Sequence, residues 1–425
     1  MNTRRTFLKT ASLAAVTTGL MDLELLARAA ASGPLIISDA RVIRVRDRRN
    51  GKGDTYLEIS SESGLKGYAG PLLKEQVAAF PLNLRQRLAG RDAADHEALN
   101  FNTLWAESFP GKSLESYAEG KDPLNQTPVW GIQRKSRQTE TGWVITGWSA
   151  VDLALWDLRG QAVKQPVWRL LKAKRTRLNA YASMLGYSTK PEEARRVARD
   201  FFDRGFSRQK WFFFNGPVDG AEGLKQNIAL AEALREELGP NAQLMFDGIQ
   251  YVWKSADVAF AIALAKGLLP IEPHWLEEPL RPDDLEGYIR LKGETGITLA
   301  AGEHWYTRWN VRPFLERKTV SFVQSDPEWC GGITEWLNIC ALVKGYPGVQ
   351  VIPHGHHVLA ASNCVASQSE TLCPMLEFLF QSRAEFQHCQ TRPLMAEGGY
   401  FAMAEEPGLG PTLDFARLEL EPASG

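Results

Sequence analysis

Six polar residues recur at similar intervals in the second half of the chain, each at or just after the end of an apolar run. They are Asp247, Glu277, Glu303, Asp326, His354 and Glu377. The successive intervals are 30, 26, 23, 28 and 23 residues. One strand with its crossover helix and loops takes about 30 residues. We therefore expect these side chains at the C-terminal ends of six successive parallel strands, where a TIM-type barrel carries its active site.

Asp247, Glu277 and Glu303 form a candidate metal site. Converging carboxylates raise one another's pKa, so three of them cannot all stay ionised without a counter-charge. A divalent cation supplies that charge, and ligands without Cys or His favour Mg²⁺, with Mn²⁺ as the alternative. A single acid of this kind can also be a surface carboxylate or a helix cap. That alternative stays open for Glu278 and Asp326 taken individually.

Asp326 and His354 are one strand–helix unit apart, so we expect them on neighbouring strands. A carboxylate bound to one imidazole nitrogen fixes the tautomer and stabilises the charged ring. This pairing makes His354 a candidate general base near neutral pH. A buried histidine bound to a backbone carbonyl is the alternative, and His356 and His357 lie close enough to compete for the role.

A regular alternation of strand and helix patterns positions these residues. Strands are predicted at 179–185, 209–214 and 243–246, and helices at 149–160, 188–202 and 222–238. Such alternation argues for an α/β fold in which parallel strands form a barrel with helices outside. We predict that the barrel spans residues 151–392.

Two flanking segments have a different pattern. Residues 34–150 begin with two strand patterns, at 36–45 and 55–60, and continue with helical and loop segments. This predicts a smaller α+β domain. We expect the segment 393–425 to pack back on it.

Residues 1–31 are predicted to be an export signal. Arg4 and Arg5 form a twin-arginine pattern, an apolar run follows at 11–20, and Ala27-Arg28-Ala29 offers a cleavage site. The run is too short for a membrane span, which needs about 20 apolar residues. We expect export to the periplasm by the twin-arginine pathway, which carries folded proteins.

The composition is ordinary for a soluble globular protein, and we expect a small-molecule partner. The 425 residues are 44% hydrophobic and 23% charged, with a net charge of −1, which gives no indication of a nucleic-acid or membrane partner. The five cysteines have no regular spacing, so we expect buried small hydrophobic residues rather than a disulfide framework or a zinc motif. We also expect a homo-oligomer.

Several motifs resemble the enolase superfamily in its mandelate racemase branch, and most closely rhamnonate-type acid-sugar dehydratases. They are Glu277-Glu278-Pro279, Gly302-Glu303, Asp326-Pro327-Glu328-Trp329-Cys330-Gly331-Gly332-Ile333-Thr334, Val351-Ile352-Pro353-His354-Gly355 and the helix at 151–157. The resemblance covers about residues 145–390. It implies a (β/α)7β barrel with an α+β capping domain that the C-terminal tail completes.

The resemblance also implies roles for the site residues. Asp247, Glu277 and Glu303 would hold Mg²⁺, which stabilises the enediolate formed when the proton α to the substrate carboxylate leaves. Asp326 and His354 would be the catalytic dyad. On the last strand, Glu377 would hydrogen-bond the substrate carboxylate.

One departure from the branch decides between reactions. Its racemases carry Lys-x-Lys on the second barrel strand, whereas this chain has Lys210-Trp211-Phe212, so the second base is absent. We therefore expect a one-base elimination by His354 that yields a 2-keto-3-deoxy acid, with Lys210 orienting the substrate carboxylate or a metal ligand. An epimerase, racemase or cycloisomerase is the alternative, as is a non-catalytic exported sugar-acid binding protein.

Two residues just past Glu303 are candidates for substrate binding. His304 and Arg308 could face substrate hydroxyls or a carboxylate, and packing of the loop explains them equally well.

Overall fold

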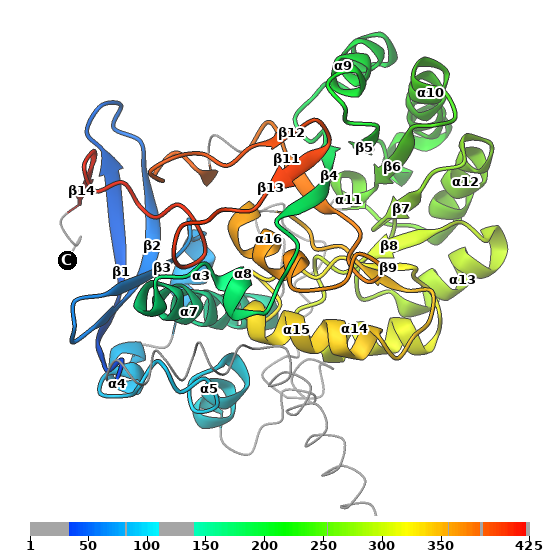
Figure 1. The fold of residues 1–425 in the computed structure, drawn as a ribbon. Helices are drawn as coiled ribbons and strands as arrows, with labels where there is room; N and C mark the ends of the chain where they lie inside the picture. Colours follow the sequence, from blue (N-terminus) through cyan, green and yellow to red (C-terminus); the bar gives the residue numbers. More distant parts are fainter. Residues whose placement is uncertain are drawn as a thin grey trace, which may run out of the picture.

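The computed structural model describes residues 34–80, 83–109, 140–252, 254–355, 357–382 and 386–421 (Figure 1). The predicted export signal at 1–31 and the competing histidine His356 lie outside the described residues. Within the described part of the chain, no helix is long and apolar enough to cross a membrane. All five cysteines are buried, as predicted.

A four-stranded antiparallel sheet forms the core of the smaller domain. Its strands, in spatial order, are β14 Leu418–Leu420, β1 Ile37–Asp47, β2 Gly53–Ser61 and β3 Lys66–Ala69. Towards its end β1 alternates buried Ile43 and Val45 with exposed arginines, the pattern of a sheet with one face on a core. β14 pairs with β1, with Leu420 opposite Val45, beside the blue strand of Figure 1. The C-terminal tail therefore completes the capping sheet.

Helices cover one side of this sheet and lead into the barrel. They are α3 Lys74–Ala79, α4 Leu84–Leu88, α5 Phe101–Ser108 and α7 Glu140–Val163. β3 packs directly on α7, because a Cβ added to Gly67 would lie 2.2 Å from the carbonyl oxygen of Ala154. Helix α7 is longer than the predicted helix at 149–160 and runs across position 150, so the two parts of the molecule share it. The predicted domain boundaries stay predictions.

Eight parallel strands form the larger domain. They are β4 Arg177–Ser183, β5 Arg208–Phe212, β6 Gln243–Asp247, β7 Trp275–Glu277, β8 Leu299–Ala301, β9 Phe322–Val323, β10 Gln350–Val351 and β11 Leu376–Leu379. Each of β4 to β9 pairs with the next strand in sequence, and β11 pairs with β4. Between β10 and β11 the described residues form no ladder, but Val351 N donates to Leu372 O at 2.9 Å.

One buried cluster shows that these strands enclose a common interior. Its members come from β4, β6, β7, β8, β9 and the residues next to β10 and β11, and they are Tyr181, Met245, Trp275, Ala300, Phe322, Ile352 and Met375. Such layers of side chains fill the inside of a TIM barrel. The predicted α/β barrel is confirmed.

Seven helices alternate with the strands and lie outside them (Figure 1). They are α9 Pro191–Asp203, α10 Gly220–Leu238, α12 Val258–Leu268, α13 Leu285–Thr295, α14 Arg308–Glu316, α15 Gly332–Val343 and α16 Val358–Ala366. In α9 the spacing of buried Ala194, Ala198 and Phe201 turns one stripe to the barrel, and Pro191 starts the helix. The described order of strands and helices is that of a (β/α)7β barrel.

Shorter elements complete the chain. They are α8 Val167–Leu170, α11 Ile249–Val252, the 3₁₀ helices η2 Pro217–Asp219 and η3 Leu269–Ile271, and the strands β12 Ala396–Glu397 and β13 Tyr400–Ala402. β13 pairs with the first half of β4, which ties the tail to the barrel before the tail reaches the capping sheet.

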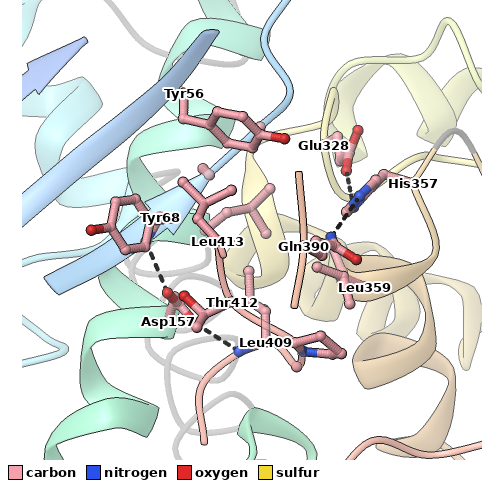
Figure 2. A pocket seen from close by; sticks show the side chains of 16 residues that line it. Tyr56, Tyr68, Asp157, Glu328, His357, Leu359, Gln390, Leu409, Thr412 and Leu413 are labelled. Atoms are coloured by element: carbon pink, nitrogen blue, oxygen red, sulfur yellow. Dashed lines mark hydrogen bonds and ion pairs between the residues drawn. The ribbon is translucent and has the colours of Figure 1, made fainter. Parts of the chain in front are cut away.

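A cavity lies where the capping sheet, the barrel and the tail meet (Figure 2). At its wall the buried carboxylate of Asp157 on α7 accepts the backbone N–H of Tyr68 in β3 and that of Leu409 in the tail, each at 2.8 Å. One side chain therefore joins three segments that are far apart in sequence.

Candidate active site

The structure brings the six evenly spaced polar residues to one end of the barrel. Asp247 and Glu277 are the last residues of β6 and β7, and Glu303 lies two residues past β8. Asp326 and His354 each lie three residues past β9 and β10. Parallel strands place their C-terminal ends on the same side, so the chain positions these groups as the spacing predicted.

Glu377 differs slightly, because it lies within β11 rather than after it. Its side chain is buried and reaches the same place, where one of its oxygens approaches Lys210.

The three predicted metal ligands form a compact buried group. One oxygen from each of Asp247, Glu277 and Glu303 lies within 4.8 Å of the others. Burial raises the pKa of Asp247 to about 6 and that of Glu277 to about 8, with Lys210 opposing the rise and neighbouring carboxylates adding to it. Converging carboxylate oxygens that resist ionisation are the donor set that a hard divalent cation fits.

Lys210 on β5 lies among these carboxylates. Its Nζ is 2.6 Å from Glu277 Oε1, 2.9 Å from Glu377 Oε1 and 3.3 Å from Asp247 Oδ2. Burial lowers the pKa of this ammonium group, but the surrounding carboxylates outweigh burial and hold the pKa well above its usual value. A charged lysine in this position can orient two metal ligands and the last-strand glutamate, although its catalytic role stays a prediction.

The predicted dyad is present. Asp326 Oδ2 accepts a hydrogen bond from His354 Nδ1 at 2.8 Å, and Asp326 Oδ1 accepts from the backbone N–H of Glu328 at 2.7 Å. The other ring nitrogen, Nε2, lies 3.5 Å from Glu303 Oε2. Burial lowers the pKa of His354, but Glu303 and Asp326 raise it more strongly, to about 10. The ring of Trp329 lies against the imidazole, with a centroid distance of 4.9 Å.

Glu278 and Asp326 are both buried, so the prediction of a surface carboxylate was wrong for both. Glu278 Oε2 contacts His304 Nδ1 at 2.9 Å, and Glu278 Oε1 accepts from Gly302 N at 3.1 Å. His304 also lies 3.3 Å from Glu303 Oε1, which places this candidate substrate residue at the metal group. Strand alternation turns Glu278 away from Glu277, and the backbone at Glu278 has a positive φ of 32°.

Two further residues escaped the sequence reasoning. Trp275 Nε1 and Gln324 Nε2 both donate to Glu277 Oε2, at 2.9 and 2.7 Å. Trp275 is two residues before Glu277 on the same strand, so the period of two could have indicated that both side chains point into the barrel. Gln324 has no such signal.

Arg308 has a different environment from the one predicted. It is the first residue of α14, and its backbone N–H and guanidinium both bind Glu335 on α15, with Nη1 2.6 Å from Oε2. Its role in substrate binding stays a prediction. The competing residue His357 contacts Glu328, with Nδ1 3.4 Å from Oε1, and the carbonyl of Phe386, while Asp326 binds His354.

Comparison with known proteins shows the family to which this fold and site belong. Residues 193–417 match the family described as "Enolase C-terminal domain-like". The chain therefore belongs to the enolase superfamily, in its mandelate racemase and muconate lactonizing enzyme branch.

Individual relatives carry more specific names. An L-rhamnonate dehydratase of Saccharopolyspora erythraea is 33% identical over 314 residues, which cover 71% of this chain and 76% of that protein. A solved structure of a proposed dehydratase from Salmonella enterica serovar Typhimurium is 25% identical, with a TM-score of 0.69 over 88% of this chain and 96% of its own. A proposed mandelate racemase from Bordetella bronchiseptica RB50 is also 25% identical, with a TM-score of 0.70 over 91% and 100%.

Proposed function

We propose that this protein is a hydro-lyase, a Mg²⁺-dependent dehydratase of a sugar acid of the aldonate or aldarate class. The observation that carries the proposal is the Asp326–His354 pair next to the buried carboxylates of Asp247, Glu277 and Glu303. The relationship to an L-rhamnonate dehydratase at 33% identity supports the hydro-lyase assignment.

The three carboxylates would hold the cation in this proposal. When bound, Mg²⁺ supplies positive charge at the substrate carboxylate, where negative charge develops as the α-proton leaves. An all-oxygen donor set favours Mg²⁺, and Mn²⁺ satisfies the same preference. Lys210 keeps Glu277 and Glu377 in place through contacts of 2.6 and 2.9 Å.

His354 performs the proton transfers. A cation held by Glu303 would offset the carboxylate charge that raises the pKa of His354 and keeps its ring protonated. Because Asp326 holds the Nδ1–H, Nε2 would then be free to accept the α-proton of the substrate. The bond from the β-carbon to its hydroxyl oxygen then breaks, and the same Nε2–H protonates the hydroxyl as it leaves as water. The enol that remains tautomerises to a 2-keto-3-deoxy acid, so atoms and charges balance without another reactant.

Phe212 supports elimination over two-base racemisation. It is the buried last residue of β5, two positions after Lys210, where racemases of the branch carry their second lysine. A phenyl ring cannot exchange a proton, which leaves His354 as the base of this mechanism.

A substrate screen tests the proposal. The full chain is incubated with a library of aldonic and aldaric acids and Mg²⁺, and 2-keto-3-deoxy acids are detected as semicarbazones. We expect one acid or a small group to react, with no product after chelation of the metal or in His354→Asn.

The same reaction followed by NMR in D₂O separates the alternatives. Exchange of the α-proton with accumulation of the epimer, and no keto acid, would refute dehydration in favour of epimerisation. Equal binding of acid sugars by the parent and His354→Asn, with no turnover across the library, would indicate a binding protein.

We also propose that this reaction takes place in the periplasm, on the basis of the signal pattern at 1–31. Cell fractionation of the parent and of an Arg4→Lys, Arg5→Lys double variant checks it. Only the parent should leave the cytoplasm.

A further inference from the structure

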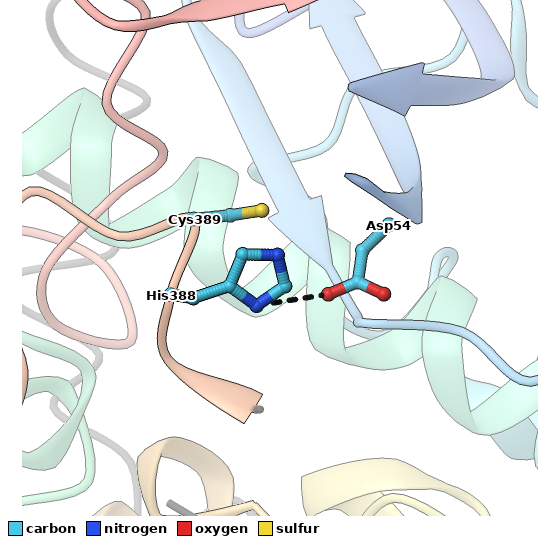
Figure 3. A group of neighbouring side chains, drawn as sticks. All are labelled: Asp54, His388 and Cys389. Carbon is cyan, nitrogen blue, oxygen red and sulfur yellow. Dashed lines mark ion pairs between the residues drawn. The ribbon is translucent and has the colours of Figure 1, made fainter. Parts of the chain in front are cut away.

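A second group of metal-ligating side chains lies outside the set of carboxylates that would hold Mg²⁺ (Figure 3). Asp54 is near the start of β2 in the capping sheet, and His388 and Cys389 are consecutive residues between β11 and β12. One ligand atom from each of the three residues lies within 4.8 Å of the others. Oxygen, nitrogen and sulfur donors from two distant segments therefore converge.

The spacing of the donors matches that of a shared cation. His388 Nδ1 is 3.4 Å from Asp54 Oδ2, which is longer than a good N–H···O hydrogen bond of about 2.7–3.2 Å. Zinc binds nitrogen and carboxylate oxygen at about 2.0–2.2 Å, so two such ligands of a tetrahedral ion lie about 3.3–3.6 Å apart.

The residues around the three donors hold them in place and leave the group accessible to an ion from solvent. Cys389 is fully buried, while the side chains of His388 and Asp54 are 18% and 29% exposed, so an ion can reach the group from solvent. Arg417 donates to the carbonyl oxygens of His388 and Gln390, which fixes the backbone on both sides of Cys389.

A free cysteine thiol has a pKa of about 8.5 and therefore carries its proton at neutral pH. Binding of a metal to sulfur requires the thiolate, so an ion at this site must release about one proton.

We propose that Asp54, His388 and Cys389 bind a divalent cation of the zinc class, which joins the capping sheet to the segment that leaves the barrel. Sulfur and imidazole donors select a borderline-soft ion, whereas the carboxylates at the barrel mouth select a hard one. The chain thus has two sites with different metal preferences. Three protein ligands leave the fourth position of a tetrahedral ion to water.

Titration with Co²⁺ as a probe tests the site, because thiolate ligation gives an intense near-ultraviolet charge-transfer absorption that oxygen ligands do not give. We expect one Co²⁺ per chain with this absorption, release of about one proton, and displacement of Co²⁺ by Zn²⁺. Glu303→Gln, which disrupts the carboxylate group, should keep the signal. The Co²⁺ signal therefore tests the second site whether or not the proposed dehydratase activity is found.

Variants assign the ligands. Cys389→Ser should abolish the absorption, and Cys340→Ser, which removes another buried thiol, should keep it. Asp54→Asn and His388→Gln change partly exposed side chains, and each should weaken Co²⁺ binding at least about tenfold. Loss of a residue that only hydrogen-bonds a metal ligand already costs about this much. Zn²⁺ should raise the melting temperature of the parent but not of His388→Gln. No stoichiometric absorption in the parent, or the same absorption in Cys389→Ser, would overturn the proposal.

Discussion

Replacing Asp326 by asparagine tests the proton path through the dyad. Both oxygens of Asp326 accept hydrogen bonds, one from His354 Nδ1 at 2.8 Å and the other from the backbone N–H of Glu328 at 2.7 Å. An asparagine has only one acceptor oxygen, and its NH₂ group is a donor. It therefore cannot satisfy both of these donors unless one of them changes.

The imidazole can carry its proton on either ring nitrogen, whereas the backbone N–H of Glu328 can only donate. Turning the amide NH₂ towards Glu328 N would leave a buried donor unpaired. This costs about 1–3 kcal/mol, which disfavours that amide orientation by a factor of about 5–150. We therefore expect the introduced asparagine to turn its NH₂ towards His354, whose neutral ring in the metal-bound enzyme then carries its proton on Nε2 instead of Nδ1. A protonated Nε2 cannot accept the α-proton. We expect kcat to fall by about 10²–10⁴-fold while the fold is retained.

The assay measures kcat on the acid sugar that the screen identifies, together with the ¹⁵N shifts of His354, which report the tautomer. Asp257→Asn is a matched control, because Asp257 accepts from Phe260 N at 2.8 Å as the N-cap of α12, where asparagine serves equally well. The reasoning fails if Asp326→Asn keeps more than about a tenth of kcat, or if its His354 still carries the proton on Nδ1.

Three further predictions concern a charge, a titration and a packing contact. Lys210→Met removes the ammonium group among the carboxylates, so calorimetry should show Mg²⁺ binding at least about tenfold more tightly while turnover falls, and unchanged affinity would contradict this role. Burial raises the pKa of Asp157 in the folded protein from 3.8 to about 6. The protonated side chain therefore contributes about 3 kcal/mol to the free energy of unfolding; this contribution is complete below pH 3.8 and is lost as the pH rises through 6. Urea unfolding between pH 4 and 7 should show the parent losing stability relative to Asp157→Asn as the pH rises, and a constant difference would refute it. Gly67→Ala forces a Cβ to within 2.2 Å of a carbonyl oxygen of α7 and should lower the unfolding free energy by about 1–3 kcal/mol, whereas Gly293→Ala, with open space around it, should raise it by about 0.5–1 kcal/mol. Similar urea midpoints for these two variants would contradict the packing argument.

The barrel and the position of its polar residues could be predicted because both follow from local patterns. An apolar run of strand length that ends on Asp247 or Glu277 is visible in the sequence, and parallel pairing then brings such ends together. The strand and helix predictions for β5, β6, α9 and α10 agree with the structure to within about three residues, the usual uncertainty at element ends.

The remaining parts of the site depend on contacts that no local pattern contains. Glu278 is buried and has a positive φ just after β7, a backbone conformation that its neighbours in sequence do not indicate. Arg308 is close to Glu303 in sequence, but its guanidinium binds Glu335, which is 27 residues away. Asp54 and His388 meet across a separation of 334 residues, so a search for closely spaced ligands could not have found them.

The pairing of β14 with β1 also constrains the order in which the molecule can be built. Arg46 and Glu419 are bonded across this pair at a separation of 373 residues. At a synthesis rate of about 5–20 residues per second, the outer edge of β1 waits about 20–75 s for its partner. During that interval β1 is an open edge, on which another chain could add a strand. Its exposed arginines at positions 41, 44 and 46 discourage such pairing, because charge on an edge strand opposes association. The arginines of β1 therefore oppose aggregation of the nascent chain until β14 has been synthesised and pairs with β1.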